Sequence, residues 1–203
     1  MLKKILKRLF DIIFSLFAFV IFSPLFLLIS ILIIIETGFP VIYKQKRWGK
    51  SCKNFILYKF RSMIKDADKK GALVTAGHDP RITKVGKFLR KTKLDELPQF
   101  FNVLIGDMSI VGPRPEVEKY AKYYKEDFEY ILSRVKPGIT DESSIQFRNE
   151  EKLLANNDNY EYIYINELLP KKLELAKKYA NNNNLLIDFL ILLKTAFVVL
   201  FKH

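Results

Sequence analysis

The sequence is poor in the residues that most metal-centred and thiol chemistry requires. It has 203 residues but only one cysteine, Cys52, and two histidines, His78 and His203. A single cysteine excludes a disulfide framework within the chain and is typical of a reducing compartment. Two histidines leave a zinc site or a histidine-based triad without its usual parts. The chain also lacks a glycine-rich phosphate loop and a dinucleotide fingerprint.

Acidic residues are scarce relative to basic ones. The chain has 34 Lys and Arg against 22 Asp and Glu, for a formal net charge of +12. Such an excess indicates an anionic partner, which on composition alone is nucleic acid, an anionic lipid surface or a phosphorylated substrate. The 17 Phe and 10 Tyr argue against intrinsic disorder. The length suits one domain with a membrane element.

Charge is absent altogether from one stretch, residues 12–35. As a helix this run is about 36 Å long, more than the ~30 Å hydrocarbon core of a bilayer. Ser23-Pro24 lies at its centre, where proline removes a backbone donor and bends or breaks a helix. A spanning helix should have basic residues mainly on one side, yet both flanks are basic here. A re-entrant helix, which enters and leaves by the same face, is therefore favoured over a spanning helix.

The remaining sequence predicts a mainly α domain with a small β-hairpin. Two apolar stretches around a turn at residues 48–50 give the hairpin, the second strand covering residues 55–60. Helices are expected over residues 84–91, 95–104, 116–134 and 150–181, the last interrupted near Asn156-Asn157 and at Pro170. Residues 112–115 are expected to be rigid and non-helical. We assign residues 1–38 to the membrane helix and residues 39–203 to the second domain.

The C-terminal stretch Leu185–Phe201 is apolar except for Asp188, Lys194 and Thr195. It is too short and too charged for a membrane span. We expect an amphipathic helix at the membrane interface, with Lys194 and Lys202 extending to the headgroups.

The most informative stretch for chemistry is Leu94–Gln99, which contains Asp95 and Glu96. By one interpretation these acids only cap a helix that begins at Pro98. By the other, one carboxylate faces a reacting phosphorus while its neighbour binds a metal. Nearby basic residues favour the second interpretation, because guanidinium groups keep a carboxylate ionised and neutralise phosphate charge. The basic residues around the pair are Lys59, Arg61, Lys84, Lys87, Arg90, Lys91, Lys93, Arg114 and Arg148.

Six motifs in this order resemble those of the small monotopic phosphoglycosyl transferases, bacterial enzymes that begin lipid-linked glycan assembly. The resemblance covers nearly the whole chain, beginning with the basic N-terminus and Ser23-Pro24. The motifs are Tyr58-Lys59-Phe60-Arg61-Ser62-Met63, Asp79-Pro80-Arg81-Ile82-Thr83-Lys84-Val85-Gly86, Leu94-Asp95-Glu96-Leu97-Pro98-Gln99, Asn102-Val103-Leu104-Ile105-Gly106-Asp107-Met108-Ser109, Gly112-Pro113-Arg114-Pro115 and Lys136-Pro137-Gly138-Ile139-Thr140.

The resemblance implies a two-step transfer of a sugar 1-phosphate from a UDP-sugar to polyprenol (undecaprenyl) phosphate. Asp95 would attack the β-phosphate and expel UMP, leaving a covalent phosphosugar that the lipid phosphate then accepts. Glu96 would bind the Mg²⁺ cofactor. Basic residues expected near the phosphates are Lys59, Arg61, Arg90, Arg114 and Arg148.

The same resemblance implies a position on the cytoplasmic face of the bacterial inner membrane, among its phospholipids. Ser23-Pro24 would break the membrane helix so that it returns to the same face. The reaction would be the first membrane step of capsule, O-antigen, exopolysaccharide or protein glycan synthesis. The sequence leaves open the sugar, the pathway and whether the chain forms a homodimer.

Two departures from the family pattern concern the substrate contacts. Asp141 and Glu142 follow the Lys136–Thr140 motif where many relatives have glycine. Some relatives also have an acidic residue at a position that aligns near Ala176, for which Glu174 or Asp188 are the candidate substitutes.

A non-catalytic module that holds anionic lipids is the main alternative function. Such a module should tolerate Asp95→Asn, whereas the enzyme should lose nearly all turnover. Nucleic-acid binding, which interleaved aromatic and basic residues could suggest, fits poorly with the long apolar N-terminus.

Overall fold

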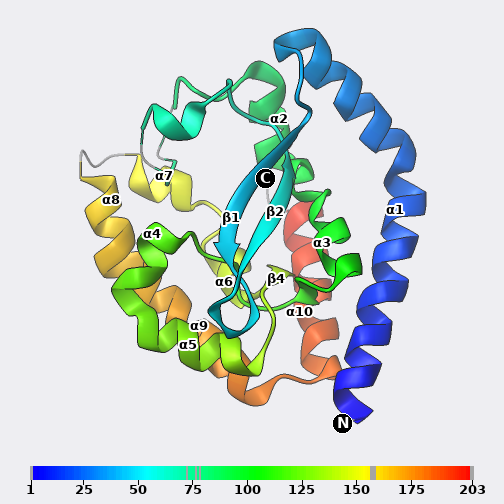
Figure 1. The fold of residues 1–203 in the computed structure, drawn as a ribbon, viewed down its shortest axis with the longest axis vertical. Helices are drawn as coiled ribbons and strands as arrows, with labels where there is room; N and C mark the ends of the chain where they lie inside the picture. Colours follow the sequence, from blue (N-terminus) through cyan, green and yellow to red (C-terminus); the bar gives the residue numbers. More distant parts are fainter. Residues whose placement is uncertain (1, 72, 76, 78, 156–158, 202–203) are drawn as a thin grey trace.

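The computed structural model describes residues 2–71, 73–75, 77, 79–155 and 159–201. Its largest element is the helix α1, Leu2–Thr37. Figure 1 shows that α1 bends, so that its second half leans over the rest of the molecule. Pro24 lies inside the helix and has no N–H to donate to the carbonyl of Val20. The hydroxyl of Ser23 donates to that carbonyl at 2.9 Å instead, so the helix is bent at the predicted place but is not interrupted.

Both ends of α1 are attached to the same domain. Near its start, Arg8 donates to the carbonyls of Val103 and Leu104, at 2.5 and 2.7 Å. At its other end, the Glu36 carboxylate accepts the backbone N–H groups of Lys84 and Val85, at 2.7 and 3.0 Å. The middle of the helix carries exposed apolar side chains. Within the described residues, α1 is the one helix long and apolar enough to cross a membrane by length and composition.

The predicted hairpin is present. Strand β1, Ile42–Trp48, pairs antiparallel with β2, Asn54–Phe60, in a register that runs from Ile42 opposite Phe60 to Trp48 opposite Asn54. Trp48, Phe55 and Leu57 are buried in the main hydrophobic core. The hairpin thereby anchors the segment that carries Lys59.

A second, smaller sheet was not predicted from the sequence. Strand β3, Ser109–Val111, pairs parallel with β4, Gly138–Thr140. The two chains approach so closely that a Cβ on Gly138 would lie 2.1 Å from the nitrogen of Gly112. Glycine is therefore required at this crossing, because any side chain would overlap the neighbouring backbone.

The helices around Asp95 and Glu96 differ from the prediction in one respect. Helix α2 covers Lys84–Thr92, and α3 covers Gln99–Ile105 with Gly106 as its C-cap, both close to expectation. The two acids lie in a separate 3₁₀ turn, Leu94–Glu96, and no side chain caps α3. The interpretation of Asp95 and Glu96 as capping residues is therefore wrong.

The remaining helices surround the core. The expected helix over 116–134 is divided into α4, Glu118–Ala121, a 3₁₀ turn, and α5, Lys125–Arg134. No break occurs at Pro170, because a π-helical turn, Tyr164–Leu168, leads into α9 and proline occupies the first turn of that helix. Asn156 and Asn157 lie outside the described residues. The other helices are α6, Glu142–Gln146, α7, Glu150–Leu154, α8, Tyr160–Ile163, α9, Leu169–Asn182, and α10, Leu185–Phe201.

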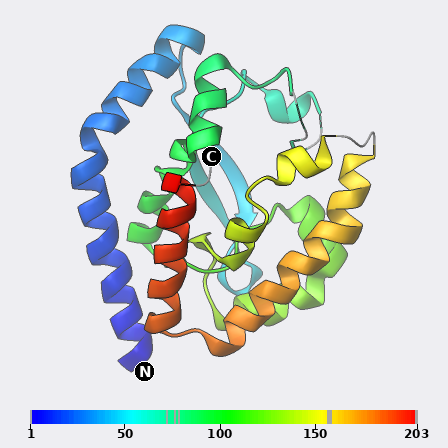
Figure 2. The same ribbon diagram turned by 180° about the vertical axis from the view of Figure 1, so that it is seen from behind.

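Helix α10 lies alongside α1, as both views show (Figures 1 and 2). An ion pair between the partly buried Lys7 and the buried Asp188 joins the two helices, with Lys7 Nζ 2.5 Å from Asp188 Oδ2. The Tyr179 hydroxyl donates to the other oxygen of Asp188 at 2.7 Å. Lys194 is exposed and its ammonium lies 3.1 Å from the Glu142 carboxylate, so its extension to the headgroups stays a prediction. Lys202 lies outside the described residues.

Candidate active site

Asp95 and Glu96 lie at the wall of a cleft of about 690 Å³. Its lining comes from the β1–β2 hairpin, the loop after β2, the 3₁₀ turn of the two acids, the segment after β3, and helices α7 and α9. Lys93 precedes the acids with a φ of 59°, a left-handed conformation that a side chain adopts only at some energetic cost. This residue turns the chain sharply out of α2, so that both acids are buried against the domain.

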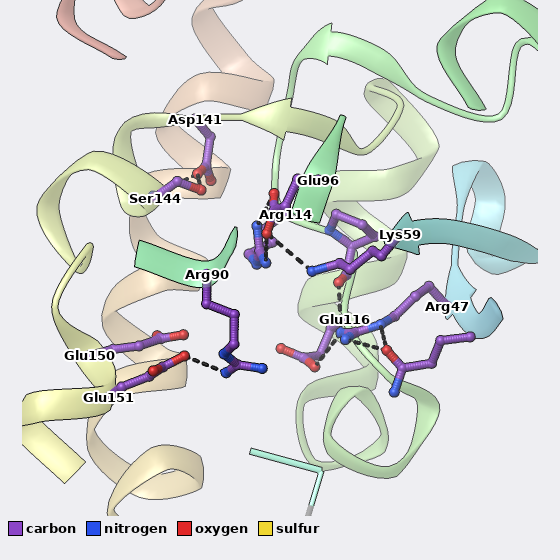
Figure 3. A network of polar contacts seen from close by, with 12 residues as sticks. Arg47, Lys59, Arg90, Glu96, Arg114, Glu116, Asp141, Ser144, Glu150 and Glu151 are labelled. Carbon is purple, nitrogen blue, oxygen red and sulfur yellow. Dashed lines mark hydrogen bonds and ion pairs between the residues drawn. The ribbon is translucent and has the colours of Figure 1, made fainter. Parts of the chain in front are cut away.

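Glu96 is held by two cations from different parts of the chain (Figure 3). Arg114 makes two hydrogen bonds to the carboxylate, at 2.6 and 3.2 Å, and Lys59 makes a third at 3.1 Å. Burial alone would raise the pKa of Glu96, but Arg114 and Lys59 hold it well below its ordinary value. Attraction to Glu96 in turn raises the pKa of Arg114. Glu96 is therefore a fixed, ionised group at neutral pH.

Asp95 has a different environment. Its side chain is buried, yet no donor among the described residues reaches Oδ1. Burial raises the pKa of Asp95, and the positive charges of Lys59 and Arg90 oppose that rise. A buried carboxylate oxygen without a partner is costly to leave unbound, so it is available to react or to bind a ligand.

The position of Lys59 depends on Asn102 in α3, which is fully buried. The β2 strand pairs only with β1 in the described sheet, so its other edge needs partners. The Asn102 amide supplies them. It donates to the carbonyl of Ile56 at 2.7 Å and accepts the N–H of Tyr58 at 3.1 Å. The helix that follows the acids thereby fixes the strand that carries Lys59.

The basic residues predicted from the sequence do not all line the cleft of Asp95 and Glu96 in the same way. Lys59, Arg90 and Arg114 line the cleft with the two acids, and Arg90 is paired with Glu151. Arg61 lines it too, but one of its guanidinium nitrogens binds Thr37 and Gly38 at the end of α1. Arg148 lines a separate pocket and donates to the carbonyl of Val198 in α10.

Several residues of the cleft were not identified from the sequence. Glu116 accepts hydrogen bonds from Arg47, at 3.3 Å, and from the hydroxyl of Tyr164. Lys172 is paired with Glu150. The position of Glu116 directly after the Gly112–Pro115 motif was a usable signal, whereas Tyr164 and Lys172 lie in stretches with no motif.

Neither candidate replaces the acid absent at Ala176. Glu174 is exposed on α9, and Asp188 is paired with Lys7 between α1 and α10. The carboxylates that do line the cleft, besides Asp95 and Glu96, include Glu116, Glu150 and Glu151.

Comparison with known proteins identifies the protein family of this chain. Residues 2–202 match the sequence profile of the bacterial sugar transferases. The chain belongs to this family.

Three relatives illustrate the similarity. The chain is 37% identical over 96% of its length to the UDP-N-acetylgalactosamine-undecaprenyl-phosphate N-acetylgalactosaminephosphotransferase of Aeromonas hydrophila. It is also 37% identical over 96% of its length to the UDP-glucose:undecaprenyl-phosphate glucose-1-phosphate transferase of Escherichia coli (strain K12). It spans only 44% and 40% of these two proteins. The sugar transferase EpsL of Bacillus subtilis (strain 168), named as uncharacterized, is 39% identical over 97% of the chain and 88% of its own length.

Proposed function

We propose that this chain transfers a sugar 1-phosphate from a UDP-sugar to undecaprenyl phosphate and releases UMP. The family and the names of its relatives support the reaction class. The observation that carries the proposal is Oδ1 of Asp95, a buried oxygen without a partner in a cleft lined by Lys59, Arg90 and Arg114.

In the first half-reaction, Oδ1 of Asp95 attacks the β-phosphorus of the UDP-sugar. A bond forms between the carboxylate oxygen and phosphorus, the diphosphate bond breaks, and UMP leaves with the electron pair. Arg90 and Lys59 stabilise the charge that develops on the phosphoryl oxygens. Glu96 keeps Lys59 and Arg114 in place and balances their charge before substrate binds. In the second half-reaction the lipid phosphate takes the phosphosugar from Asp95.

The residues of the cleft are compatible with a Mg²⁺ cofactor. No group of three acids within the described residues could hold a metal alone. Mg²⁺ is commonly bound by one or two carboxylates together with substrate phosphates, and carboxylate oxygens are its preferred ligands. Oε2 of Glu96 accepts one hydrogen bond of 3.2 Å in the described structure and is the oxygen available to such a cation, since Oδ1 of Asp95 is the attacking atom. Bound there, the cation would neutralise charge on the diphosphate.

We further propose that α1 is re-entrant and places the domain on the cytoplasmic face of the inner membrane. The attachment of both its ends to one domain supports this topology, because a straight spanning helix would carry its ends about 30 Å apart to opposite faces. The bend at Pro24 allows the return. The lipid phosphate would then meet the cleft at the level of the headgroups.

The decisive experiment measures UMP release from a panel of UDP-sugars with Mg²⁺ and undecaprenyl phosphate in detergent. The panel includes UDP-glucose, UDP-galactose and UDP-N-acetylgalactosamine. Wild-type protein should release UMP with at least one donor, and Asp95→Asn should lose nearly all release while keeping its fold. Asp127→Asn is the matched control, because Asp127 pairs with Lys177 and does not line the cleft.

Folded wild-type protein that releases no UMP with any donor would contradict the proposal and favour the lipid-binding module. Release that survives in Asp95→Asn would exclude Asp95 as the nucleophile.

A further inference from the structure

The helix that carries Arg90, α2, has little of its own to fix its position. It has nine residues, and isolated helices of that length are marginal in water, so its place depends on the elements that hold it. Gly86 and Leu89 are its buried residues. Arg90 follows Leu89 in the last turn of the helix and lines the cleft with Asp95. The contacts of α2 therefore decide where the Arg90 guanidinium lies.

One of these contacts comes from the second half of α1. Leu89 is 1% exposed and belongs to a hydrophobic cluster that includes Ile29 and Ile33 of α1. These two residues are almost fully buried, although few residues of α1 are. Both lie after Pro24, in the half of α1 that leans over the domain (Figure 1). The bend in α1 thereby brings the apolar helix against α2.

A second contact comes from Glu36, in the last turn of α1. Its two carboxylate oxygens accept the N–H groups of Lys84 and Val85, the first two residues of α2, at 2.7 and 3.0 Å. The Thr83 hydroxyl accepts the next N–H, that of Gly86, at 2.9 Å. The first N–H groups of a helix have no partner within it, and negative charge at that end complements the helix dipole. Glu36 therefore caps a helix to which it does not belong.

A third contact holds α2 against the end of β2. A Cβ on Gly86 would lie 1.9 Å from the carbonyl oxygen of Ser62, which directly follows β2 by two residues. The same carbonyl accepts the N–H of Thr83 at 3.2 Å. Arg61, the residue before Ser62, donates in turn to the end of α1. The end of α1, the start of α2 and the end of β2 thus form one junction.

We infer that Glu36 is a positioning residue for phosphoryl transfer, which fixes α2 and, through α2, the guanidinium of Arg90. The inference rests on the proposed function, in which Arg90 stabilises charge on the transferring phosphoryl group. Glu36 is exposed and does not line the cleft, so it acts through the helix that it caps. A misplacement of about 1 Å can cost about 10²-fold in rate. The membrane helix and the geometry of the cleft are coupled at this junction.

A double-mutant cycle separates this role from simple stabilisation of α2. Glu36→Ala is made in the wild type and in Arg90→Gln, and kcat/KM for UMP release is measured in all four proteins. We expect at least about a fivefold loss in the wild type and less than about a twofold loss in Arg90→Gln, where the interaction to be lost is already absent. Glu36→Gln keeps one acceptor oxygen and should lie between wild type and Glu36→Ala.

The matched control is Asn184→Ala. It removes the side-chain oxygen that accepts the N–H of Ile187 at 2.9 Å, in the first turn of α10. No described residue of α10 lines the large cleft, so kcat/KM should stay within about twofold of wild type. Equal losses for Glu36→Ala in both backgrounds, or no loss in the wild type, would overturn the inference. If Glu36→Ala fails to fold, Glu36→Gln decides the cycle.

A measurement without turnover separates this inference from the proposed function. A nitroxide on Lys87→Cys, an exposed position of α2, reports the motion of that helix in a chain that also carries Cys52→Ser. We expect Glu36→Ala to increase the mobility of the label and Asn184→Ala to leave it unchanged. An unchanged label in Glu36→Ala would overturn the positioning of α2 by Glu36. Absence of UMP release in the wild type would instead contradict the proposed function.

Discussion

The position of Lys59 beside Glu96 depends on one buried amide, so Asn102→Ala should damage both stability and activity. The change removes both hydrogen bonds to the outer edge of β2, at 2.7 and 3.1 Å. It leaves the carbonyl of Ile56 and the N–H of Tyr58 without partners. Each unsatisfied buried group costs about 1–3 kcal/mol, so the free energy of unfolding should fall by roughly 2–6 kcal/mol.

Thermal unfolding in detergent measures this loss. For a chain of this size, each kcal/mol corresponds to about 2–4 °C, so Tm should fall by about 4–24 °C. UMP release assayed well below that Tm should also fall by at least about tenfold, because Lys59 is no longer held 3.1 Å from Glu96. Asn182→Ala is the control, since its exposed amide bonds only its own helix, and it should change stability by less than about 0.5 kcal/mol.

Asn102→Asp separates the two hydrogen bonds. An ionised aspartate still accepts the N–H of Tyr58 but repels the carbonyl of Ile56. Burial raises the pKa of such a group, so lowering the pH protonates it and restores a donor. Its loss of Tm relative to wild type should therefore shrink as the pH falls. A Tm for Asn102→Ala within about 1 °C of wild type would refute the argument.

Three further predictions concern pH, the helix bend and the ion pair of Lys7 with Asp188. UMP release should fall as the pH drops through the pKa of Asp95, which lies above the ordinary value of 3.8, because only the carboxylate attacks. Arg90→Gln should move this acid limb to higher pH, since the positive charge of Arg90 lowers that pKa. Pro24→Ala restores the N–H to the carbonyl of Val20, so the straightened helix should expose its two ends to an impermeant thiol reagent on opposite membrane faces. Asp188→Ala removes the carboxylate that pairs with the partly buried ammonium of Lys7 and accepts the Tyr179 hydroxyl, and should cost about 1–3 kcal/mol, of which Lys7→Met in the same chain should recover part.

Each of these three predictions has its own result that would contradict it. An acid limb that Arg90→Gln leaves in place would show that another group controls the pH dependence. Labelling of Cys52 and an engineered N-terminal cysteine from opposite faces in the unmodified helix would contradict the re-entrant topology. Equal stability of Asp188→Ala and wild type, measured by Tm, would show that the ion pair with Lys7 contributes nothing.

The sequence by itself determined the structural elements that depend on residues close together in the chain. A long uncharged run with a central proline predicted the bent helix, and two short apolar stretches around a turn predicted the hairpin. The order of short motifs indicated the family, and within them the Asp95-Glu96 pair stood out because charge accumulates around it. These inferences need only neighbouring residues, since periodicity, proline and turn chemistry act within a few positions.

Only the tertiary structure decided which distant groups meet. The ion pairs of Lys7 with Asp188 and of Lys172 with Glu150 join residues far apart in the chain. The parallel pairing of β3 with β4 and the separation of Arg148 from the large cleft are equally non-local. Such contacts follow from the burial of a common core, whose packing brings together residues that no local pattern connects. The sequence therefore indicated the two acids of the cleft, whereas the structure assigned Glu96 to a fixed ion-paired position and left an oxygen of Asp95 without a partner among the described residues.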